Sequence, residues 1–377
     1  MDHPATPHPP LADDELPYWV AWTHLAVATA DLWKIIDAIG SLRAAWTASA
    51  DQLRTAGISP SLAASIERQR PDIDPKTAFN RVAEAGLSLC TFHDPNYPPL
   101  LKQIHDPPIV LFYRGRIADL GPTVAIVGTR RASDYGLQVT WELASNLARA
   151  GLTIVSGLAL GVDTAAHKAT LAVKGRTLAV LGGGADVPTL YPPSNRALAG
   201  AIAASGGAVL SEYPPGTPPL PYRFPERNRI IAGLSLGTIV TEAPVKSGAL
   251  ITARVAAEEN REVFAVPGRI TDVNAAGPNR LLDTGATLVR SAEDILTALN
   301  IEMPATHQPY ASSGLIPGEN PEAAILNCLQ EPLNRDELQR RSLLPPATLA
   351  ATLTLLEVQG AIRKLPSGKF FRADSHS

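Results

Sequence analysis

Residues 124–136 read VAIVGTRRASDYG, and this stretch decides the fold. Four consecutive apolar residues, Val124 to Val127, are typical of a strand that is buried on both faces of a sheet. Gly128 ends the strand, and Ser133 is placed to cap a following helix, because a serine hydroxyl accepts hydrogen bonds from free backbone N–H groups. A buried strand, a short loop and a helix form the unit from which parallel α/β sheets are built.

The same unit repeats downstream. Further short, β-rich apolar runs alternate with helical patterns, at residues 153–155, 177–181, 208–210, 238–241, 263–266 and 287–289. Upstream, a helix (76–85) and two strands (88–91 and 109–113) lead into this series. Strands that alternate with helices predict a parallel sheet with helical crossovers. We therefore predict an α/β fold with an extended Rossmann-like, doubly wound and mostly parallel sheet.

Smaller segments flank this core. Residues 18–72 show helical spacing and predict a bundle of about four helices, similar in size to SAM or helix-hairpin-helix modules, with a structural or protein-contacting role favoured over DNA contact. After a Pro- and Ser-rich linker, three helical patterns and two short strands about a Pro-Ser-Gly turn predict a winged helix. Its third helix is rich in leucine and poor in cations, which favours protein contact over duplex binding. The predicted division is 1–17 tail, 18–72 helical domain, 73–300 core, 301–319 linker and 320–374 winged helix.

Composition limits the classes of protein. The chain has 377 residues, of which 45% are hydrophobic and 18% charged, as in an ordinary folded protein of two or three domains. Its first seventeen residues are Pro-rich and acidic, and predict a disordered tail rather than a signal peptide. No apolar run approaches the ~18 residues that a membrane span requires. Cys90 and Cys328 lie far apart, so we expect neither a disulfide nor a zinc site. We expect a cytoplasmic protein.

The distribution of charge is more informative than its sum. The formal net charge is −3, yet residues 121–290 carry 16 Lys and Arg against 12 Asp and Glu, an excess of four positive charges. The rest of the chain is therefore acidic, at −7. Any anion-binding site should be local and central.

Unusual loops follow the predicted strands, at the edge where an open α/β sheet binds its ligands. The first loop carries Arg130 and Arg131 before a helix start, which predicts an anion site. Simple solvation of both arginines is the alternative. The second loop, Ser156-Gly157 and onward to Lys168, offers a hydroxyl donor and close backbone approach, although Asp163 and His167, four residues apart, could simply pair on one helix face.

Three further loops complete the edge. Residues 182–184 are three glycines that either approach a ligand or permit a tight turn, and Ser194 is expected to cap the next helix. Residues 224–230, FPERNRI, predict a loop whose arginines bind phosphate or pair with a buried carboxylate, Glu242 being a candidate for Arg229. Phe224 either stacks on a base or, the favoured interpretation, belongs to the core. Residues 246–248, Lys-Ser-Gly, precede a long helix and predict a second anion site, where Ser247 could also be a plain N-cap.

These loops supply little catalytic apparatus. They contain no cysteine, no carboxylate pair placed for acid/base work and no histidine cluster for a metal. We therefore expect a binding protein and not an enzyme, without catalytic residues, metal or cofactor.

Six long motifs, in order along the chain, resemble one known family. VGTRRASDYG, SGLALGVDTAAH, LGGGADVPTLYPPSN, FPERNRIIAGLS, TEAPVKSGALITARVAAEENREVFAVPG and GPNRLLDTGA are similar to the DprA (Smf) family of DNA-processing proteins. The resemblance covers roughly residues 95–289. It implies a dimer that binds single-stranded DNA through backbone phosphates, with little sequence preference. It also implies loading of RecA recombinase onto incoming strands during natural transformation, in competition with single-strand-binding protein.

The resemblance also implies site residues. The strand-binding arginine of the family falls at Arg130, its Ser-Gly loop at Ser156 and Gly157 with Lys168 nearby, and its Lys-Ser-Gly loop at residues 246–248. The Arg-Asn-Arg element falls at residues 227–229, where sequence does not divide ligand binding from structure. The expected DNA-binding set is Arg130, Arg131, Ser156, Gly157, Lys168, Phe224, Arg227, Asn228, Arg229, Lys246, Ser247 and Gly248.

Two other functions are weighed against this one. Nucleotide phosphoribohydrolases share the fold class, but their PGGxGTxxE motif is not matched by residues 246–252, KSGALIT, which lack the paired glycines and the trailing glutamate. A duplex-DNA regulator that uses the terminal winged helix is the second alternative.

Overall fold

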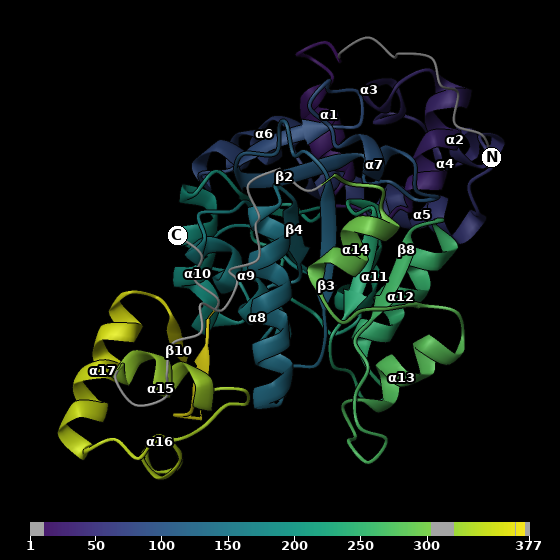
Figure 1. The fold of residues 1–377 in the computed structure, drawn as a ribbon. Coiled ribbons are helices and arrows are strands. Elements are labelled where there is room, and N and C mark those ends of the chain that lie inside the picture. The colour runs from purple at the N-terminus through teal and green to yellow at the C-terminus, as the bar shows by residue number, and fades with distance from the viewer. Residues whose placement is uncertain (1–10, 303–319, 366, 374–377) are drawn as a thin grey trace.

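The computed structural model describes residues 11–302, 320–365 and 367–373, and its centre is one nine-stranded sheet (Figure 1). The spatial order is β1-β2-β6-β5-β4-β3-β7-β8-β9. Strands β3 to β9 pair in parallel, whereas β1 and β2 add an antiparallel edge, so the predicted fold class is confirmed. The strands are β1 Ser88–Thr91, β2 Val110–Gly115, β3 Thr123–Val127, β4 Thr153–Ser156, β5 Thr177–Val180, β6 Ala208–Ser211, β7 Gly237–Val240, β8 Glu262–Ala265 and β9 Thr287–Leu288.

Strand β3 shows why this sequence forms a two-faced core. All five of its residues are buried. Val124 and Ile126 belong to the apolar cluster on one face of the sheet, whereas Ala125 and Val127 belong to the cluster on the other. Because successive side chains of a strand point to opposite faces, an unbroken apolar run is what a strand covered on both sides requires.

Helices connect the strands and cover the sheet (Figure 1). They are α6 Pro75–Glu84, α7 Pro99–Lys102, α8 Asp134–Arg149, α9 Val162–Ala172, α10 Arg196–Ala204, α11 Arg223–Gly233, α12 Gly248–Glu258, α13 Ala276–Asp283 and α14 Ala292–Ala298, with the 3-10 turn η2 Pro193–Asn195. Residues 224–230, expected as a loop, lie in α11. Pro225 stands in the first turn of that helix, where a proline is tolerated because its missing N–H would have no intrahelical partner. Ser194 was expected to cap a helix, but it lies inside η2, directly before α10.

The N-terminal segment is more helical than expected. Five short helices and a 3-10 turn stand where about four helices were predicted, and α1 already begins at Leu16, inside the predicted tail; residues 1–10 of that tail lie outside the described part. The elements are α1 Leu16–Trp22, α2 Thr29–Ile39, α3 Leu42–Ala45, α4 Ala50–Thr55, α5 Pro60–Gln69 and η1 Arg70–Asp72. Their buried side chains, including Trp19 and Trp22, belong to the same apolar cluster as Leu111 of β2. These helices therefore pack against the antiparallel edge of the sheet.

The C-terminal domain is a winged helix with its own apolar core. It consists of α15 Pro321–Cys328, α16 Arg335–Ser342, α17 Pro346–Val358 and the antiparallel pair β10 Ile362–Lys364 and β11 Phe370–Arg372. Most of the predicted linker, residues 303–319, lies outside the described part of the chain. None of the helices in the described part combines the length and the apolar character that crossing a membrane demands.

The order of the strands places a crevice between β3 and β7. From β3 the chain adds β4, β5 and β6 on one side, then returns to add β7, β8 and β9 on the other. At such a reversal the loops after the two central strands leave in opposite directions, and the space between them is where open α/β sheets bind ligands. Those loops here contain Arg130 and Lys246.

Gly128, the residue after β3, is required by close packing. A Cβ at this position would lie 2.5 Å from Val162 Cγ2 and 2.8 Å from the carbonyl oxygen of Glu242. We expect Gly128→Ala to lower the free energy of unfolding by roughly 1–3 kcal/mol, because the core there has no room for a methyl group. Chemical denaturation followed by circular dichroism measures this change.

Gly200 supplies the matched control. It is an exposed glycine inside α10, and a Cβ there would have no atom within 4 Å. Gly200→Ala should leave the protein equally or more stable, by about 0.5–1 kcal/mol. Equal behaviour of the two variants would contradict the packing argument.

Candidate nucleic-acid interface

A cavity of about 730 Å³ lies between the loops that follow β3 and β7. The first turns of α11 and α12 also contribute to its wall, and we call this cavity the switch-point groove. Most of the predicted site residues line it, namely Arg130, Arg131, Phe224, Arg227, Asn228, Lys246, Ser247 and Gly248. Tyr191, which sequence reasoning did not select, lines it as well. The available signal was an aromatic residue next to two prolines in a loop after β5.

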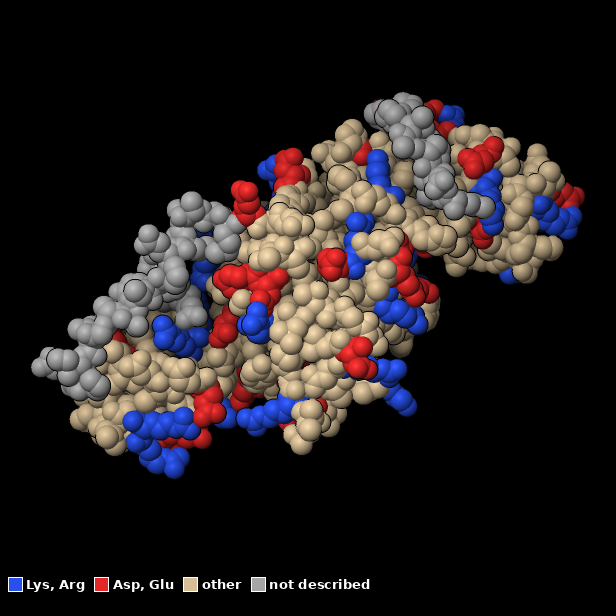
Figure 2. All heavy atoms as spheres, turned by 45° about the vertical axis from the view of Figure 1, so that its right-hand side comes forward, with Lys and Arg blue, Asp and Glu red and all other residues tan. Residues whose placement is uncertain are grey.

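The groove presents three exposed cations, Arg130, Arg131 and Lys246. Within the described residues none of the three has a carboxylate within ion-pair distance, and the guanidinium of Arg130 instead stands 5.5 Å from the ring centre of Phe224. On the face that Figure 2 shows, positive and negative side chains are interspersed over most of the surface. The unpaired cations of the groove therefore favour a local anionic ligand.

Arg227 is a buried cation at the floor of the groove, with a side chain only 5% exposed. Its Nη1 donates to the carbonyl oxygens of Gly157, at 2.9 Å, and of Val180. Burial lowers its pKa to about 10, although the nearby Asp163 carboxylate opposes this, so the guanidinium stays charged at neutral pH. Arg227 thus joins α11 to the ends of β4 and β5 while keeping its charge next to the groove.

Asp163 is the acidic residue of the groove lining, and its carboxylate already accepts hydrogen bonds from the protein backbone. Its Oδ2 accepts from the backbone N–H groups of Gly157 and Ala159, at 3.1 and 3.3 Å. Burial raises the pKa of Asp163, and the positive charge of Arg227 opposes the rise. The expected alternative, a pair between Asp163 and His167, is wrong, since His167 Nδ1 lies 2.7 Å from Thr177 Oγ1.

The loop after β7 presents the start of α12 to the groove. The Ser247 hydroxyl accepts from the N–H of Ala249 at 3.3 Å and so caps the helix. Asn228 Nδ2 donates to the carbonyl oxygen of Gly248 at 3.2 Å, which fixes this loop to α11. A Cβ on Gly248 would meet no atom within 4 Å, so the backbone here is open to a ligand. A helix N-terminus beside Lys246 is a favourable place for a phosphate.

Phe224 corrects another expectation. The favoured interpretation placed it in the core, but it is only partly buried and belongs to none of the apolar clusters in the described residues. Its ring packs against that of Tyr191, with centroids 5.9 Å apart, and both rings line the groove. Aromatic rings beside cations without carboxylate partners suit a ligand that has both planar and anionic parts.

Four predicted residues lie outside the groove lining, and the first three are Ser156, Gly157 and Lys168. Ser156 is completely buried and its hydroxyl donates to the carbonyl oxygen of Ile126 at 2.6 Å, so the expectation that it donates to a ligand is wrong. Gly157 donates its N–H to Asp163 and accepts from Arg227 at its carbonyl oxygen, so its backbone binds protein groups instead of a ligand. Lys168 is exposed on α9, beyond the lining, and its DNA contact stays a prediction.

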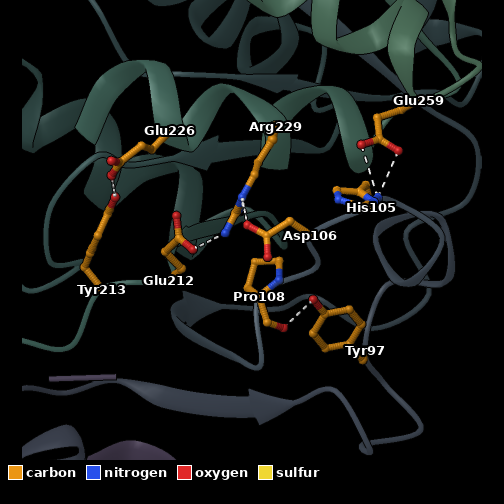
Figure 3. A network of polar contacts seen from close by, with 9 residues as sticks. All are labelled: Tyr97, His105, Asp106, Pro108, Glu212, Tyr213, Glu226, Arg229 and Glu259. Atoms are coloured by element: carbon orange, nitrogen blue, oxygen red, sulfur yellow. Dashed lines mark hydrogen bonds and ion pairs between the residues drawn. The ribbon is translucent and has the colours of Figure 1, made fainter. Parts of the chain in front are cut away.

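Arg229, the fourth predicted residue outside the lining, forms a structural ion pair (Figure 3). Its Nε lies 3.1 Å from Asp106 Oδ2, and its Nη2 lies 2.5 Å from Glu212 Oε2. Burial alone would lower the pKa of Arg229, but the two carboxylates raise it further than burial lowers it. Burial also raises the pKa of Glu212, against the effect of Arg229. The predicted structural pairing is therefore confirmed, while the suggested partner, Glu242, is wrong.

Glu242 instead closes the N-terminus of α8. Its carboxylate accepts from the backbone N–H of Ser133 at 2.8 Å and from the Ser133 hydroxyl at 2.5 Å. A Cβ on Gly136 would lie 2.4 Å from Glu242 Oε2, so the carboxylate sits directly against the first turn of the helix. The expectation of an anion site at this helix start is wrong, because a protein carboxylate already fills it.

The three glycines at 182–184 serve packing. A Cβ on Gly182 would lie 3.1 Å from the Phe224 ring, and one on Gly183 would lie 3.0 Å from the backbone nitrogen of Pro219. Gly184 donates to the carbonyl oxygen of Thr217 at 2.9 Å. The glycines therefore allow close packing against residues 217–219 and Phe224, and neither the tight turn nor the ligand contact is observed.

His167 should make stability depend on pH. Burial, together with the positive charge of Arg227, lowers its pKa from 6.5 to about 3. Between these two pKa values the unfolded chain binds one proton more than the native protein, so the free energy of unfolding should fall as the pH drops from about 6.5 toward 3. The expected loss is about 2 kcal/mol between pH 7 and pH 5.

The variant His167→Gln removes this titration. Its unfolding free energy, measured by denaturation at a series of pH values, should fall less steeply with decreasing pH than that of the wild type, by about 1.4 kcal/mol per pH unit. Identical slopes for the two proteins would show that His167 does not titrate on unfolding.

The chain is similar to known proteins over most of its length. Residues 88–300 match the model of the family described as DNA recombination-mediator protein A, and residues 308–368 match that of the DprA winged helix domain. Protein Smf of Synechocystis is 41% identical over 77% of this chain and 74% of the relative. The DNA processing protein DprA of Bacillus subtilis is 44% identical over 67% of this chain and 83% of the relative.

Two solved structures agree with this assignment. DprA from Streptococcus pneumoniae superposes with a TM-score of 0.63 at 37% identity, and covers 74% of this chain and 95% of its own. DNA processing protein A from Helicobacter pylori, described for its single-stranded DNA binding mode, gives a TM-score of 0.51 at 33% identity, and covers 57% of this chain and 95% of its own. The protein therefore belongs to the DNA recombination-mediator protein A family, the family of DprA and Smf.

Proposed function

We propose that this protein binds single-stranded DNA without sequence preference, holding the backbone phosphates in the switch-point groove. The observation that carries the proposal is the meeting of Arg130, Arg131 and Lys246, none of them paired with a carboxylate in the described structure, with the open start of α12. Phosphate contacts of this kind give affinity without reading sequence. The relative from Helicobacter pylori, described as binding single-stranded DNA, supports the same assignment.

The aromatic wall favours a single strand over a duplex. Phe224 and Tyr191 line the groove together with Arg130, and a strand with unstacked bases can place a base on such rings. A duplex keeps its bases stacked inside and offers only its backbone. The groove thus suits a ligand whose bases and phosphates are both accessible.

We also propose that the protein binds without turning over its ligand. Among the residues lining the groove the carboxylate of Asp163 already accepts two backbone hydrogen bonds, so it is badly placed to move a proton. The described residues contain no group of His, Cys, Asp and Glu that could hold a metal ion. Incubation with nucleoside monophosphates should release no free base, and such release would support the hydrolase alternative.

The family match supports a wider role. We propose that the protein acts in the cytoplasm as a homodimer, protects incoming DNA and loads RecA recombinase onto it during natural transformation, in competition with single-strand-binding protein. The name of the matching family, a recombination mediator, supports this role. The test is RecA filament growth on single strands already coated with single-strand-binding protein, which addition of this protein should accelerate. An unchanged rate of filament growth would contradict the loading role.

Removing a groove cation should weaken binding to all sequences alike. Arg130→Ala or Lys246→Ala should each lower the affinity for single strands, and should reduce the slope of log affinity against log salt by roughly 0.7 for each phosphate that the variant no longer neutralises. Fluorescence anisotropy with labelled oligonucleotides of differing sequence, at several salt concentrations, measures both quantities. Arg254→Ala, which removes an exposed cation from α12 outside the groove, is the control and should bind as the wild type does. Weaker binding to some sequences only would contradict phosphate binding.

Gly248→Ala tests the backbone contact separately from charge. The added methyl group would meet no atom of the protein within 4 Å, so the thermal midpoint should not fall. It would stand in the groove at the start of α12, where we propose that a phosphate approaches the backbone. Affinity for single strands should therefore drop although no charge has changed. Wild-type affinity in this variant would exclude a close phosphate at this helix.

A further inference from the structure

The wing of the C-terminal domain, formed by β10 and β11, packs against α8 of the core (Figure 1). The ring of Phe371 meets the ring of Trp141 edge to face, with centroids 6.0 Å apart, and the guanidinium of Arg363 stands 5.4 Å from the same Trp141 ring. Arg363 and Phe371 are direct cross-strand partners, so both lie on one face of the wing. That face is the one turned toward the core.

The Lys369 end of the wing lies beside the N-terminal end of α8. Lys369 lies two residues before Phe371, on the same face, and its Nζ is 3.6 Å from Oδ2 of Asp134. Asp134 is the first residue of α8 and lies about two turns before Trp141. Lys369, which directly precedes β11, therefore lies near the start of α8.

The start of α8 adjoins the loop that carries the groove cations. Arg131 stands three residues before Asp134, so their Cα atoms are separated by at most about 11 Å. The side chain of Arg131 lines the groove, and its carbonyl oxygen accepts from Asn274, which holds the loop in place. Lys369 of the wing and Arg131 of the groove are therefore linked through Asp134, which contacts Lys369 and follows Arg131 by three residues.

The net positive charge of the winged helix lies on the wing, because the three arginines of α16 share their helix with Asp336 and Glu337. Helix α17, which would enter the major groove if this domain read a duplex, carries the single charged residue Glu357 and buries three leucines in the domain core. The wing and its flanks, residues 361–365 and 367–373, carry four cations and no carboxylate. Contact of this domain with a nucleic acid would therefore use the wing rather than α17.

We infer that the wing continues the phosphate track of the switch-point groove, so that a single strand leaving the groove past Arg131 is held by Lys369 and Lys364. The inference rests on the proposed function and extends its site to the second domain. Lys364 is exposed next to the turn, on the face of the wing opposite to α8. The Lys369–Asp134 pair is partly exposed, with 38% and 26% of the two side chains accessible. A partly exposed pair of this kind contributes little to stability, so a phosphate can take the place of Asp134.

The test uses the full chain and thymidine oligonucleotides of increasing length. Lengths from about 6 to about 30 nucleotides extend beyond the ~4–16 that one binding module usually occupies. The double variant Lys364→Ala/Lys369→Ala should bind the shortest oligonucleotides as the wild type does, because these fill only the groove. With longer oligonucleotides the wild type should gain affinity, whereas the variant should gain less. The salt slope of the variant should be lower by up to roughly 1.4, because it leaves two phosphates without a lysine.

Two control variants separate the position and the charge of the lysines from other effects. Arg335→Ala/Arg340→Ala removes the same charge from α16 of the same domain and should behave as the wild type. Lys364→Arg/Lys369→Arg keeps the charge and should retain the gain in affinity with length. The inference is overturned if the alanine variant gains affinity with length like the wild type, if the α16 control is weakened as much, or if the arginine variant is weakened too. If the wild type binds no single strand of any length, the proposed function fails and the inference falls with it.

Discussion

The hydrogen bonds of Glu242 hold the switch-point groove in shape. This residue follows β7, and its side chain is only 7% exposed. Its carbonyl oxygen accepts from the N–H of Thr129 at 2.7 Å, and its carboxylate accepts from the N–H and the hydroxyl of Ser133. The loop after β3 is thus fixed at both ends by a single residue that follows the neighbouring strand. Arg130 and Arg131 lie between the two fixed points, so their backbone is already ordered in the absence of a ligand. Binding a ligand therefore costs little conformational entropy in this loop.

Arg227 and Arg229 of α11 have different roles because different groups surround them. Arg229 lies against two carboxylates, Asp106 and Glu212, and its charge is fully compensated within the protein. Arg227 donates to neutral carbonyl oxygens, and Asp163 acts on it only from beyond ion-pair distance. A buried cation without a close counter-ion is costly. An anion that enters the groove would reduce that cost, so Arg227 supports phosphate binding even though its hydrogen bonds are structural.

The sequence predicted the sheet and the placing of the groove cations, because both follow from local patterns. Buried strands show as apolar runs, and the topology of a doubly wound sheet then brings the loops with Arg130 and Lys246 to one edge. The division between Arg227 and Arg229 could not be predicted in the same way. It depends on residues 223–233 forming a helix, on which positions two apart point to opposite sides, whereas residues 224–230 were expected to form a loop. The partners Asp106 and Glu212 come from distant loops that no local pattern connects.

Sequence patterns also gave the wrong burial for Ser156 and Phe224. Ser156 is more buried than expected, and Phe224 is less buried than expected. A serine next to a glycine after a strand looks like a ligand donor, but here it closes a hydrogen bond between strands and is wholly buried. A phenylalanine before a proline looks like core, but here it faces the groove with Tyr191 and Arg130. The burial of a residue depends on the assembled fold. Residue type and spacing therefore predict only how buried such residues are on average, not how buried one particular residue is. What identifies the groove is that aromatic rings outside the apolar core and cations without carboxylate partners meet at the crevice that the sheet topology creates. A chain with a net charge of −3 can therefore bind a polyanion, because at the Debye length of about 8 Å under physiological salt the ligand is attracted by the nearby cations and screened from the distant carboxylates.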